Sequence, residues 1–474
     1  MSLSFTLAPC SRLGPRTGTL TLRSVSINTP GLMVTTSRGV VPHLSRDQHK
    51  RTAALRLVHV PFETFLENTP PTPTLQPGLH PLHTFLGFDP NVHLVAMTLR
   101  DPADGKEMPS NGHDYISAST ARGVRKVTPN QWREYVRACA PDVVVALPDV
   151  PWSLPPFSQK RTTKSIERTA AWLAHLLAPS PPLNILVHMA GGTSEAARRS
   201  FSESLTETLH GKEAEAVSPH RCIDDGAAGY IFDLLPLRRE MDAEAREQDP
   251  VHRANETQAL LAVSLEHLSP TKLRVVNSVA SPHEILRLIR SVGVDVFDAK
   301  WAQDAAHVGV ALDFVFPIRD KELRRDLGHN LYRLQYANDF AAFSAAACFC
   351  GACAPVAPPS AISHSALDAH VSALALPPAY TRAYVHHLLH THEMSAHALL
   401  VLHNLAVLDA FFAGVRDVLL RGEDLGAHAD AFSAQYDENL TIVHEARAMW
   451  KEVDIARGKG RMARERAADH SELP

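Results

Sequence analysis

Over the first two thirds of the chain, short apolar runs alternate with longer segments in which apolar residues recur at helical spacing. The run at 143–147 is rich in valine and lies between Pro141 and Pro148, which is typical of a buried parallel strand. In the segment 164–177 that follows, apolar residues recur every three or four positions. This pattern predicts a strand followed by a helix.

The same alternation predicts a series of strands and helices. Strands are expected at 184–189, 230–232, 274–276 and 294–298, and helices at 194–209 and 283–291. Ser281-Pro282 supplies an N-cap residue and then a proline for the first position of the last helix. Such regular alternation indicates βαβ units around a parallel sheet. An α/β fold of the (β/α)8 TIM-barrel type with insertions fits this length best, and an open parallel sheet is the alternative.

Composition and charge place this fold in an ordinary globular protein. Of the 474 residues, 45% are hydrophobic and 21% charged, and the formal net charge is −4. The surface is therefore not basic overall, so any contact with nucleic acid must be local or shared with a partner. The sequence shows neither a signal peptide nor an uninterrupted apolar run of about 20 residues, so we expect a cytoplasmic protein without a transmembrane helix.

Three of the six cysteines lie in one short segment, Cys348-Phe349-Cys350-Gly351-Ala352-Cys353. Three thiolates at this spacing can surround a tetrahedral Zn²⁺, which needs one further nitrogen or sulfur ligand. The stretch that follows is rich in histidine and can supply it. A disulfide framework and three simply buried thiols are the alternatives, but Cys10, Cys139 and Cys222 are too scattered to suggest paired cysteines.

The cysteine segment also marks a change in organisation, because the predicted strands stop after Arg325. We expect a barrel at 10–325, a helical zinc-binding subdomain integrated with the barrel at 326–425, and a helical tail that frays at 426–474. The segment 354–378 is rich in alanine, proline and serine and is typical of a loop insertion.

The cysteine segment, together with 380–388 and Leu402-His403-Asn404, resembles the zinc signature of the tRNA-guanine transglycosylases. Further similar segments are 16–20, 28–31, 37–44, 164–172 and 293–298. The resemblance implies a zinc-bearing (β/α)8 barrel, in a family that exchanges guanine for a deazaguanine base in tRNA anticodons. It also implies one structural zinc ion per chain, held by Cys348, Cys350, Cys353 and His403.

Other histidines could in principle take the fourth position. His386 and His390 lie one helical turn apart, and His392-Glu393 with His397 nearly reproduces a metalloprotease H-E-x-x-H motif. In that motif, however, the second histidine comes one residue too late to share a helix face with the first.

The catalytic residues of the family are less well preserved than its zinc signature. By the resemblance, Asp298 stands where the nucleophile would be, at the end of a barrel strand. A loop that carries paired glycines in active relatives reads 112–119 here and lacks them, and Met189-Ala190 stands where those relatives present a glutamine. The turn at 229–236 has large side chains in place of a glycine pair, and 299–303 also departs from active members. We interpret Asp298 as vestigial and the base pocket as unused.

This combination resembles the noncatalytic members of the family, each paired with a catalytic paralogue in the eukaryotic queuine tRNA-ribosyltransferase. The implied function is an accessory subunit, not an enzyme on its own. The heterodimer would exchange guanine for queuine at the wobble position of GUN-anticodon tRNAs, which serve aspartate, asparagine, histidine and tyrosine. The alternatives are an active transglycosylase that uses Asp298 with Asp149, and a zinc-stabilised RNA-binding scaffold.

Two surfaces follow from this interpretation. Candidates for contact with tRNA phosphates are Lys160, Arg161 and Lys164, or Arg319, Lys321, Arg324 and Arg325. The segment 395–420 carries two apolar stripes, with Leu399 and Leu402 on one and Val401 and Leu405 on the other. We expect the second stripe to face the partner subunit, because a helix that packs only on its own barrel needs one.

Overall fold

The computed structural model of the chain describes residues 2–49, 52–177, 182–244, 250–318, 323–346, 348–354 and 380–454. The chain forms two compact units. The first unit comprises Met1–Arg46, Ala54–Trp301 and Phe412–Ala429, and the second comprises Asp47–Ala53, Ala302–Phe411 and Asp430–Pro474. The three-part division at 325 and 425 stays a prediction.

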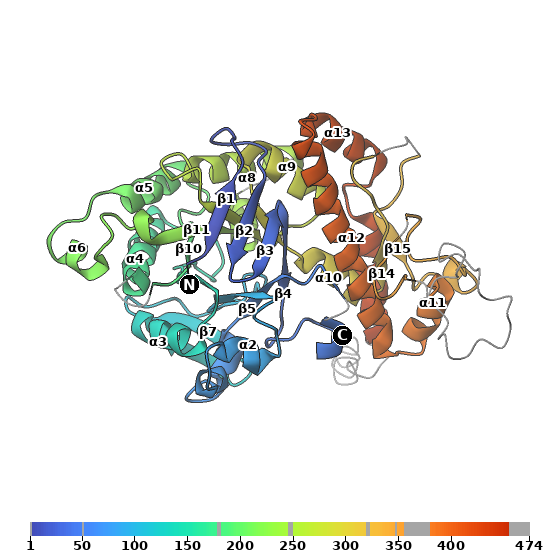
Figure 1. The fold of residues 1–474 in the computed structure, drawn as a ribbon, viewed down its shortest axis with the longest axis horizontal. Coiled ribbons are helices and arrows are strands. Elements are labelled where there is room, and N and C mark those ends of the chain that lie inside the picture. Colours follow the sequence, from blue (N-terminus) through green and yellow to red (C-terminus); the bar gives the residue numbers. More distant parts are fainter. Residues whose placement is uncertain are drawn as a thin grey trace, which may run out of the picture. The chain divides into compact units, whose positions relative to one another are not determined.

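A closed barrel of parallel strands forms the centre of the first unit (Figure 1). The strands close in the order β10-β11-β12-β13-β4-β5-β6-β9. Their bounds are β4 Gly31–Thr35, β5 Leu57–Pro61, β6 Leu94–Thr98, β9 Val143–Val145, β10 Ile185–His188, β11 Ala227–Asp233, β12 Leu273–Asn277 and β13 Val296–Asp298. Since every neighbouring pair is parallel, all carboxyl ends open at one mouth, where barrel enzymes place their active sites.

Helices follow the barrel strands. They are α1 Arg46–His49, α2 Pro81–Leu86, α3 Pro129–Cys139, α4 Gln159–Leu177, α5 Glu195–Thr206, α6 Gly211–Val217, α7 Leu234–Glu244, α8 Pro250–Ser264, α9 Pro282–Val292 and α10 Lys300–His307. The predicted helices at 164–177, 194–209 and 283–291 correspond to α4, α5 and α9. Ser281 caps α9 by accepting a hydrogen bond from the Glu284 amide, and Pro282 occupies the first helical position. The predicted (β/α)8 fold is therefore confirmed.

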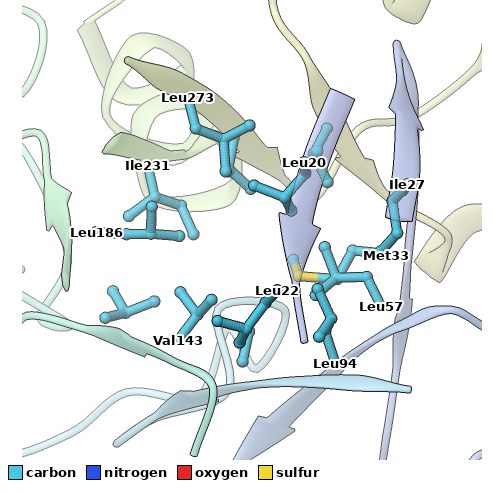
Figure 2. Packing of buried hydrophobic residues seen from close by; sticks show 14 of the residues in the cluster. Leu20, Leu22, Ile27, Met33, Leu57, Leu94, Val143, Leu186, Ile231 and Leu273 are labelled. Carbon is cyan, nitrogen blue, oxygen red and sulfur yellow. The ribbon is translucent and has the colours of Figure 1, made fainter. Parts of the chain in front are cut away.

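An antiparallel sheet of β1 (Ser4–Leu7), β2 (Gly18–Leu22) and β3 (Val25–Thr29) covers the amino-terminal end of the barrel. Its apolar residues, among them Leu20 and Leu22, alternate with polar ones and pack against residues at the starts of the barrel strands (Figure 2). The barrel contributors include Leu57, Leu94 and Leu273. This end of the barrel is a closed hydrophobic core, whereas Asp233, Asn277 and Asp298 end their strands at the opposite mouth.

Between β6 and α3 the chain forms a separate hairpin of β7 (Ile116–Thr120) and β8 (Gly123–Val127). The second unit contains β14 (Val310–Leu312) and β15 (Gly328–Asn330), which pair antiparallel. The expectation that strands stop after Arg325 is therefore wrong by one short strand, because 328–330 is too brief and too polar to signal a strand.

The remaining helices are α11 Arg382–His390, α12 Met394–Leu420, α13 Leu425–Gln435 and α14 Thr441–Asp454. Helix α12 is long and apolar enough to cross a membrane, but 67% of its most apolar window is buried inside the chain, as in the core helix of a globular protein. The predicted loop insertion at 354–378 lies almost wholly outside the described residues, as does the end of the predicted tail after Asp454.

Candidate functional site

The three clustered cysteines and His403 come together in the second unit. His403 Nδ1 lies 3.6 Å from Cys348 Sγ, 3.9 Å from Cys350 Sγ and 3.3 Å from Cys353 Sγ. All four donor atoms lie within 4.8 Å of one another, and His403 has no exposed surface. The amide of Cys353 donates to Cys350 Sγ at 3.3 Å, which holds the cysteine loop in a tight turn around this point.

The tautomer of His403 is fixed by the strand beside it. Its Nε2 lies 2.7 Å from the carbonyl oxygen of Leu312 in β14, so Nε2 carries the proton and donates it. Nδ1 is therefore the ring nitrogen that faces the sulfurs and the one that could bind a metal ion. This arrangement is typical of a metal-binding histidine, which almost always donates its other ring N–H to a nearby acceptor.

The next residue of α12 strengthens the same contact. Asn404 Oδ1 accepts from the Leu312 amide at 2.9 Å, and Asn404 Nδ2 donates to the carbonyl oxygens of Val310 and Ala302 at 3.0 and 3.1 Å. His403 and Asn404 thus bind both backbone groups of Leu312, and α12 and β14 hold the imidazole in place. The ring of Phe343 packs edge-on against His403, with the ring centroids 5.3 Å apart.

The donor atoms fit a tetrahedral zinc ion. With a Zn–S bond of about 2.3 Å and a Zn–N bond of about 2.1 Å, a tetrahedral site places sulfur and nitrogen about 3.6 Å apart. The three observed nitrogen–sulfur distances lie on either side of that value. The cluster therefore has the donor atoms and the nitrogen–sulfur spacing to hold a metal ion.

The ionisation of each thiol in the cluster depends on its neighbours. Hydrogen bonds from Cys350 and Cys353 hold the pKa of Cys348 well below its usual range, whereas hydrogen bonding to Cys348 raises the pKa of Cys353. One thiolate is thus favoured at the expense of its neighbour. A divalent cation at the centre of the cluster would remove this competition.

The other candidate histidines are engaged elsewhere. His386 Nδ1 and His390 Nε2 lie 2.8 and 3.1 Å from the carbonyl oxygens of Leu331 and Tyr332. His392 lies between α11 and α12 with φ of 64°, so it shares no helix with His397 and a metalloprotease motif does not form. Among the described residues, the cysteine cluster is the one group with the geometry of a metal site.

At the barrel mouth, Asp298 ends β13 as the sequence predicts, but its side chain is fully buried. Its carboxylate accepts hydrogen bonds from the amides of Ser278 at 2.7 Å and Val279 at 3.2 Å. Burial raises the pKa of Asp298 to about 7, although these two amides act in the opposite direction. No face of this carboxylate is open to a substrate.

The carboxylate of Asp149 is occupied by neighbouring side chains. The two terminal nitrogens of Arg161, Nη1 and Nη2, donate to the two carboxylate oxygens of Asp149 at 2.9 and 2.8 Å. Arg168 Nη1 donates to Asp149 Oδ2 at 3.2 Å. Asn111 Nδ2 donates to Asp149 Oδ1 at 2.8 Å. These contacts neutralise the charge and use the acceptor positions that a bound base would need.

Sequence reasoning missed this cluster of Asp149, Asn111, Arg161 and Arg168. A signal was present, because Arg161 and Arg168 are seven residues apart and therefore share one face of α4. Asn111 had no such signal, since it lies in an irregular loop. The Arg161 guanidinium forms an ion pair with Asp149, and its predicted contact with tRNA phosphate stays a prediction.

A further polar cluster lines the mouth where β10, β11 and β12 end. His188 Nε2 lies 2.9 Å from Asp233 Oδ2, and Asn277 donates to Asp233 Oδ1 at 2.8 Å. Burial opposes ionisation of Asp233, but the charge and hydrogen bond of His188 hold its pKa below the usual range. A cavity of about 70 Å³ remains between His188, Asp149 and Glu240. Asp233 stands in the turn that was expected to carry large side chains.

The remaining surface predictions have mixed outcomes. Lys160 and Lys164 are exposed on α4, whereas Arg324 pairs with Asp437 at 3.6 Å and Arg325 donates to the Tyr436 hydroxyl at 2.8 Å. Arg319 and Lys321 lie outside the described residues.

Both apolar stripes of α12 are largely covered by this chain itself. Leu399 and Leu402 on one stripe are buried, and Val401, Leu405 and Leu408 on the other are also buried. The argument that the second stripe requires a partner is therefore wrong, because two sides of α12 lie in the chain's own core.

Comparison with known proteins gives a consistent picture. The family model described as queuine tRNA-ribosyltransferase matches residues 10–221 and 249–438. A protein of Schizosaccharomyces pombe named queuine tRNA-ribosyltransferase accessory subunit 2 is 26% identical over 416 residues, covering 86% of this chain and 79% of its own length. Proteins of the same name from Aedes aegypti and Drosophila grimshawi are 25% and 26% identical, covering 87% of this chain and 88% of their own lengths.

Proposed function

Because this chain belongs to the queuine tRNA-ribosyltransferase family, we propose that it is the noncatalytic accessory subunit of such an enzyme. Its partner is a catalytic subunit of the same family, and the heterodimer exchanges guanine for queuine at the wobble position of GUN-anticodon tRNAs. The relatives named as accessory subunits match this chain over most of its length, which supports the assignment.

The observation that carries the noncatalytic assignment is the state of the two carboxylates at the barrel mouth. Base exchange needs one exposed carboxylate as the nucleophile and a pocket with free hydrogen-bonding groups for the base. Asp298 is buried against the backbone, and Asp149 is bound by two arginines and an asparagine. Neither group is free to perform its part of the reaction.

The cysteine cluster has a structural role in this proposal. Cys348, Cys350, Cys353 and His403 would hold one Zn²⁺, and four protein donors leave no open position for catalysis. The bound ion would link the cysteine loop to α12 and β14 and so contribute to folding stability. The need for three reduced thiols favours a cytoplasmic location, and all six cysteines of the chain are free.

The proposal is tested by reconstitution with a catalytic paralogue. The purified chain alone should not incorporate labelled queuine into a GUN-anticodon tRNA, and the equimolar mixture should. Asp298→Asn in this chain should leave the activity of the mixture within about twofold, because the nucleophile belongs to the partner. Incorporation by the chain alone that is abolished by Asp298→Asn would instead establish it as an active transglycosylase.

A further inference from the structure

A group of exposed cations lies on the β7–β8 hairpin, and no part of the described chain neutralises it. Arg122 lies in the turn, and Arg125 and Lys126 lie in β8; we call these three residues the basic hairpin. None forms an ion pair with an acid among the described residues, and Lys126 lies 4.4 Å above the ring of Tyr115. By contrast, the exposed Arg199 pairs with Glu266 at 3.1 Å.

The hairpin has a defined conformation, so its cations are held in place. In the turn, the Thr120 hydroxyl donates to the Gly123 carbonyl at 2.7 Å and accepts from the Arg122 amide at 3.2 Å. Gly123 has φ of 101°, which only glycine adopts readily. Antiparallel pairing places Arg125 opposite Ala118 and Lys126 opposite Ser117, so the two cations point to opposite faces of the ribbon.

Two buried side chains fasten the inner strand β7 to the barrel mouth. Glu63, in the short helix η1 (Glu63–Glu67) after β5, accepts from the amides of Ser119 and Asp101, each at 2.8 Å. Asn111 Oδ1 accepts from the Ser117 amide at 3.0 Å, while its Nδ2 donates to Asp149. Through Asn111, Asp149 therefore helps to hold the hairpin at the barrel mouth instead of binding a base.

The outer strand β8 is exposed along Gly123–Lys126, and it is an edge strand with β7 as its one neighbour. Its free edge offers backbone N–H groups beside the three cations. Charged residues on an edge strand also have a simpler explanation, because they prevent edge-to-edge aggregation. The two explanations differ in one respect: protection of an edge works with either sign of charge, whereas binding of phosphates requires positive charge.

We propose that the basic hairpin binds the phosphate backbone of tRNA, an inference that rests on the proposed function. The spread of the cations over both faces of a rigid ribbon suits contact with successive phosphates. Val124, 44% exposed, is the only large apolar side chain exposed on the described hairpin, which is too little for insertion into a membrane.

The test uses the reconstituted heterodimer and a GUN-anticodon tRNA transcript. Replacement of the three cations (R122E, R125E and K126E together) should weaken tRNA binding by about tenfold or more near physiological salt. The slope of log K against log salt should become shallower by about 2–3 units, since each phosphate contact contributes about 0.7–0.9. The KM for tRNA should rise while kcat at saturating tRNA stays unchanged.

The matched control reverses Arg447 and Lys451, which are exposed on α14 and form no ion pair within the described chain (R447E and K451E). It should bind tRNA as the unaltered complex does. A second variant, with glutamine at the three hairpin positions, should also lose affinity and show the shallower slope.

Three results would overturn the inference. The first is an unchanged salt slope and KM in the glutamate variant while the unaltered complex is active. The second is aggregation of the glutamine variant alone, with normal tRNA binding by the glutamate variant, which would leave edge protection as the role. The third is a glutamate variant that binds tRNA normally but no longer binds anionic lipid vesicles to which the unaltered complex binds. If the unaltered complex itself has no activity, the proposed function is contradicted. This outcome is therefore distinct from a failure of the inference about the basic hairpin.

Discussion

Two carboxylates at the barrel mouth have lost their availability for chemistry in different ways. Asp298 lies in its expected place at the end of β13, but burial and two backbone amides leave it no access to solvent. Asp149 forms ion pairs with Arg161 and Arg168. A sequence can place both acids at the ends of strands, yet it does not reveal which neighbours cover them.

The buried Asp298 predicts a pH dependence of stability. Its pKa of about 7 in the folded chain lies above the usual value of an unfolded aspartate, so the folded state binds a proton that the unfolded state releases. The stabilisation is complete below about pH 4 and is lost as the pH rises through about 7. At pH 8, Asp298→Asn should therefore raise the free energy of unfolding, by on the order of 2–4 kcal/mol.

Urea unfolding at pH 5 and pH 8 measures this effect. The exposed Asp114→Asn on the same barrel face serves as the control and should change little at either pH. Equal loss of stability by the Asp298 variant at both values would show that the carboxylate stabilises the fold in its ionised form.

The metal cluster predicts a coupled loss of zinc and stability. Cys350→Ala removes one of four donors, so the purified chain should carry much less than one zinc ion and melt several degrees lower. Cys222→Ala, a half-buried thiol far from the cluster in sequence, should keep its metal. Elemental analysis measures the zinc content of each variant, and thermal melting measures its stability. A full complement of zinc in the Cys350 variant would exclude that thiol as a ligand.

At the scale of elements, α12 shows how one helix can do several tasks. Its apolar residues fill the core on two sides, and the polar pair His403-Asn404 binds the backbone of Leu312 in β14. The two apolar stripes of this segment predict a surface for a partner, but residues of both stripes are buried in the chain itself. Whether a second apolar side of a helix is buried in the same chain depends on the elements around that helix. The periodicity of apolar residues within the helix does not show which elements these are.

Asn404 is expected to be essential to this arrangement. Asn404→Leu leaves the Leu312 amide and the carbonyl oxygens of Ala302 and Val310 without their present partner, at a cost of about 3 kcal/mol in the free energy of unfolding. Because the same strand fixes His403, the variant should also release zinc faster to a chelator. The exposed Ala410→Leu on α12 controls for the added volume, and equal stability of the two variants would argue against this role.

At the scale of the whole molecule, the alternation of apolar strands and helices was enough to predict a parallel α/β fold and to favour a barrel over an open sheet, because both faces of its strands are buried and their β-branched runs are continuous. The cluster of three cysteines and His403 was likewise predictable, since its chemistry lies in residue type and spacing. The hairpin on the barrel mouth and the Asn111–Asp149 contact were not, because they depend on irregular loops that carry no periodicity. The short strand β15 was not predictable because its three residues, Gly328–Asn330, are too few and too polar to show a strand pattern.

The contacts around Asp149 also constrain how this lineage can change. To free the acid for a base, Arg161, Arg168 and Asn111 would all have to be replaced. If the arginines are removed first, a buried negative charge is left without a partner, which costs about 3–5 kcal/mol. If the acid is removed first, the two cations are left unpaired. Replacing Asn111 also releases the amide of Ser117 in β7. Each of these single substitutions passes through a less stable protein, so the carboxylate of Asp149 cannot be freed for a base by one substitution at a time without a loss of folding stability.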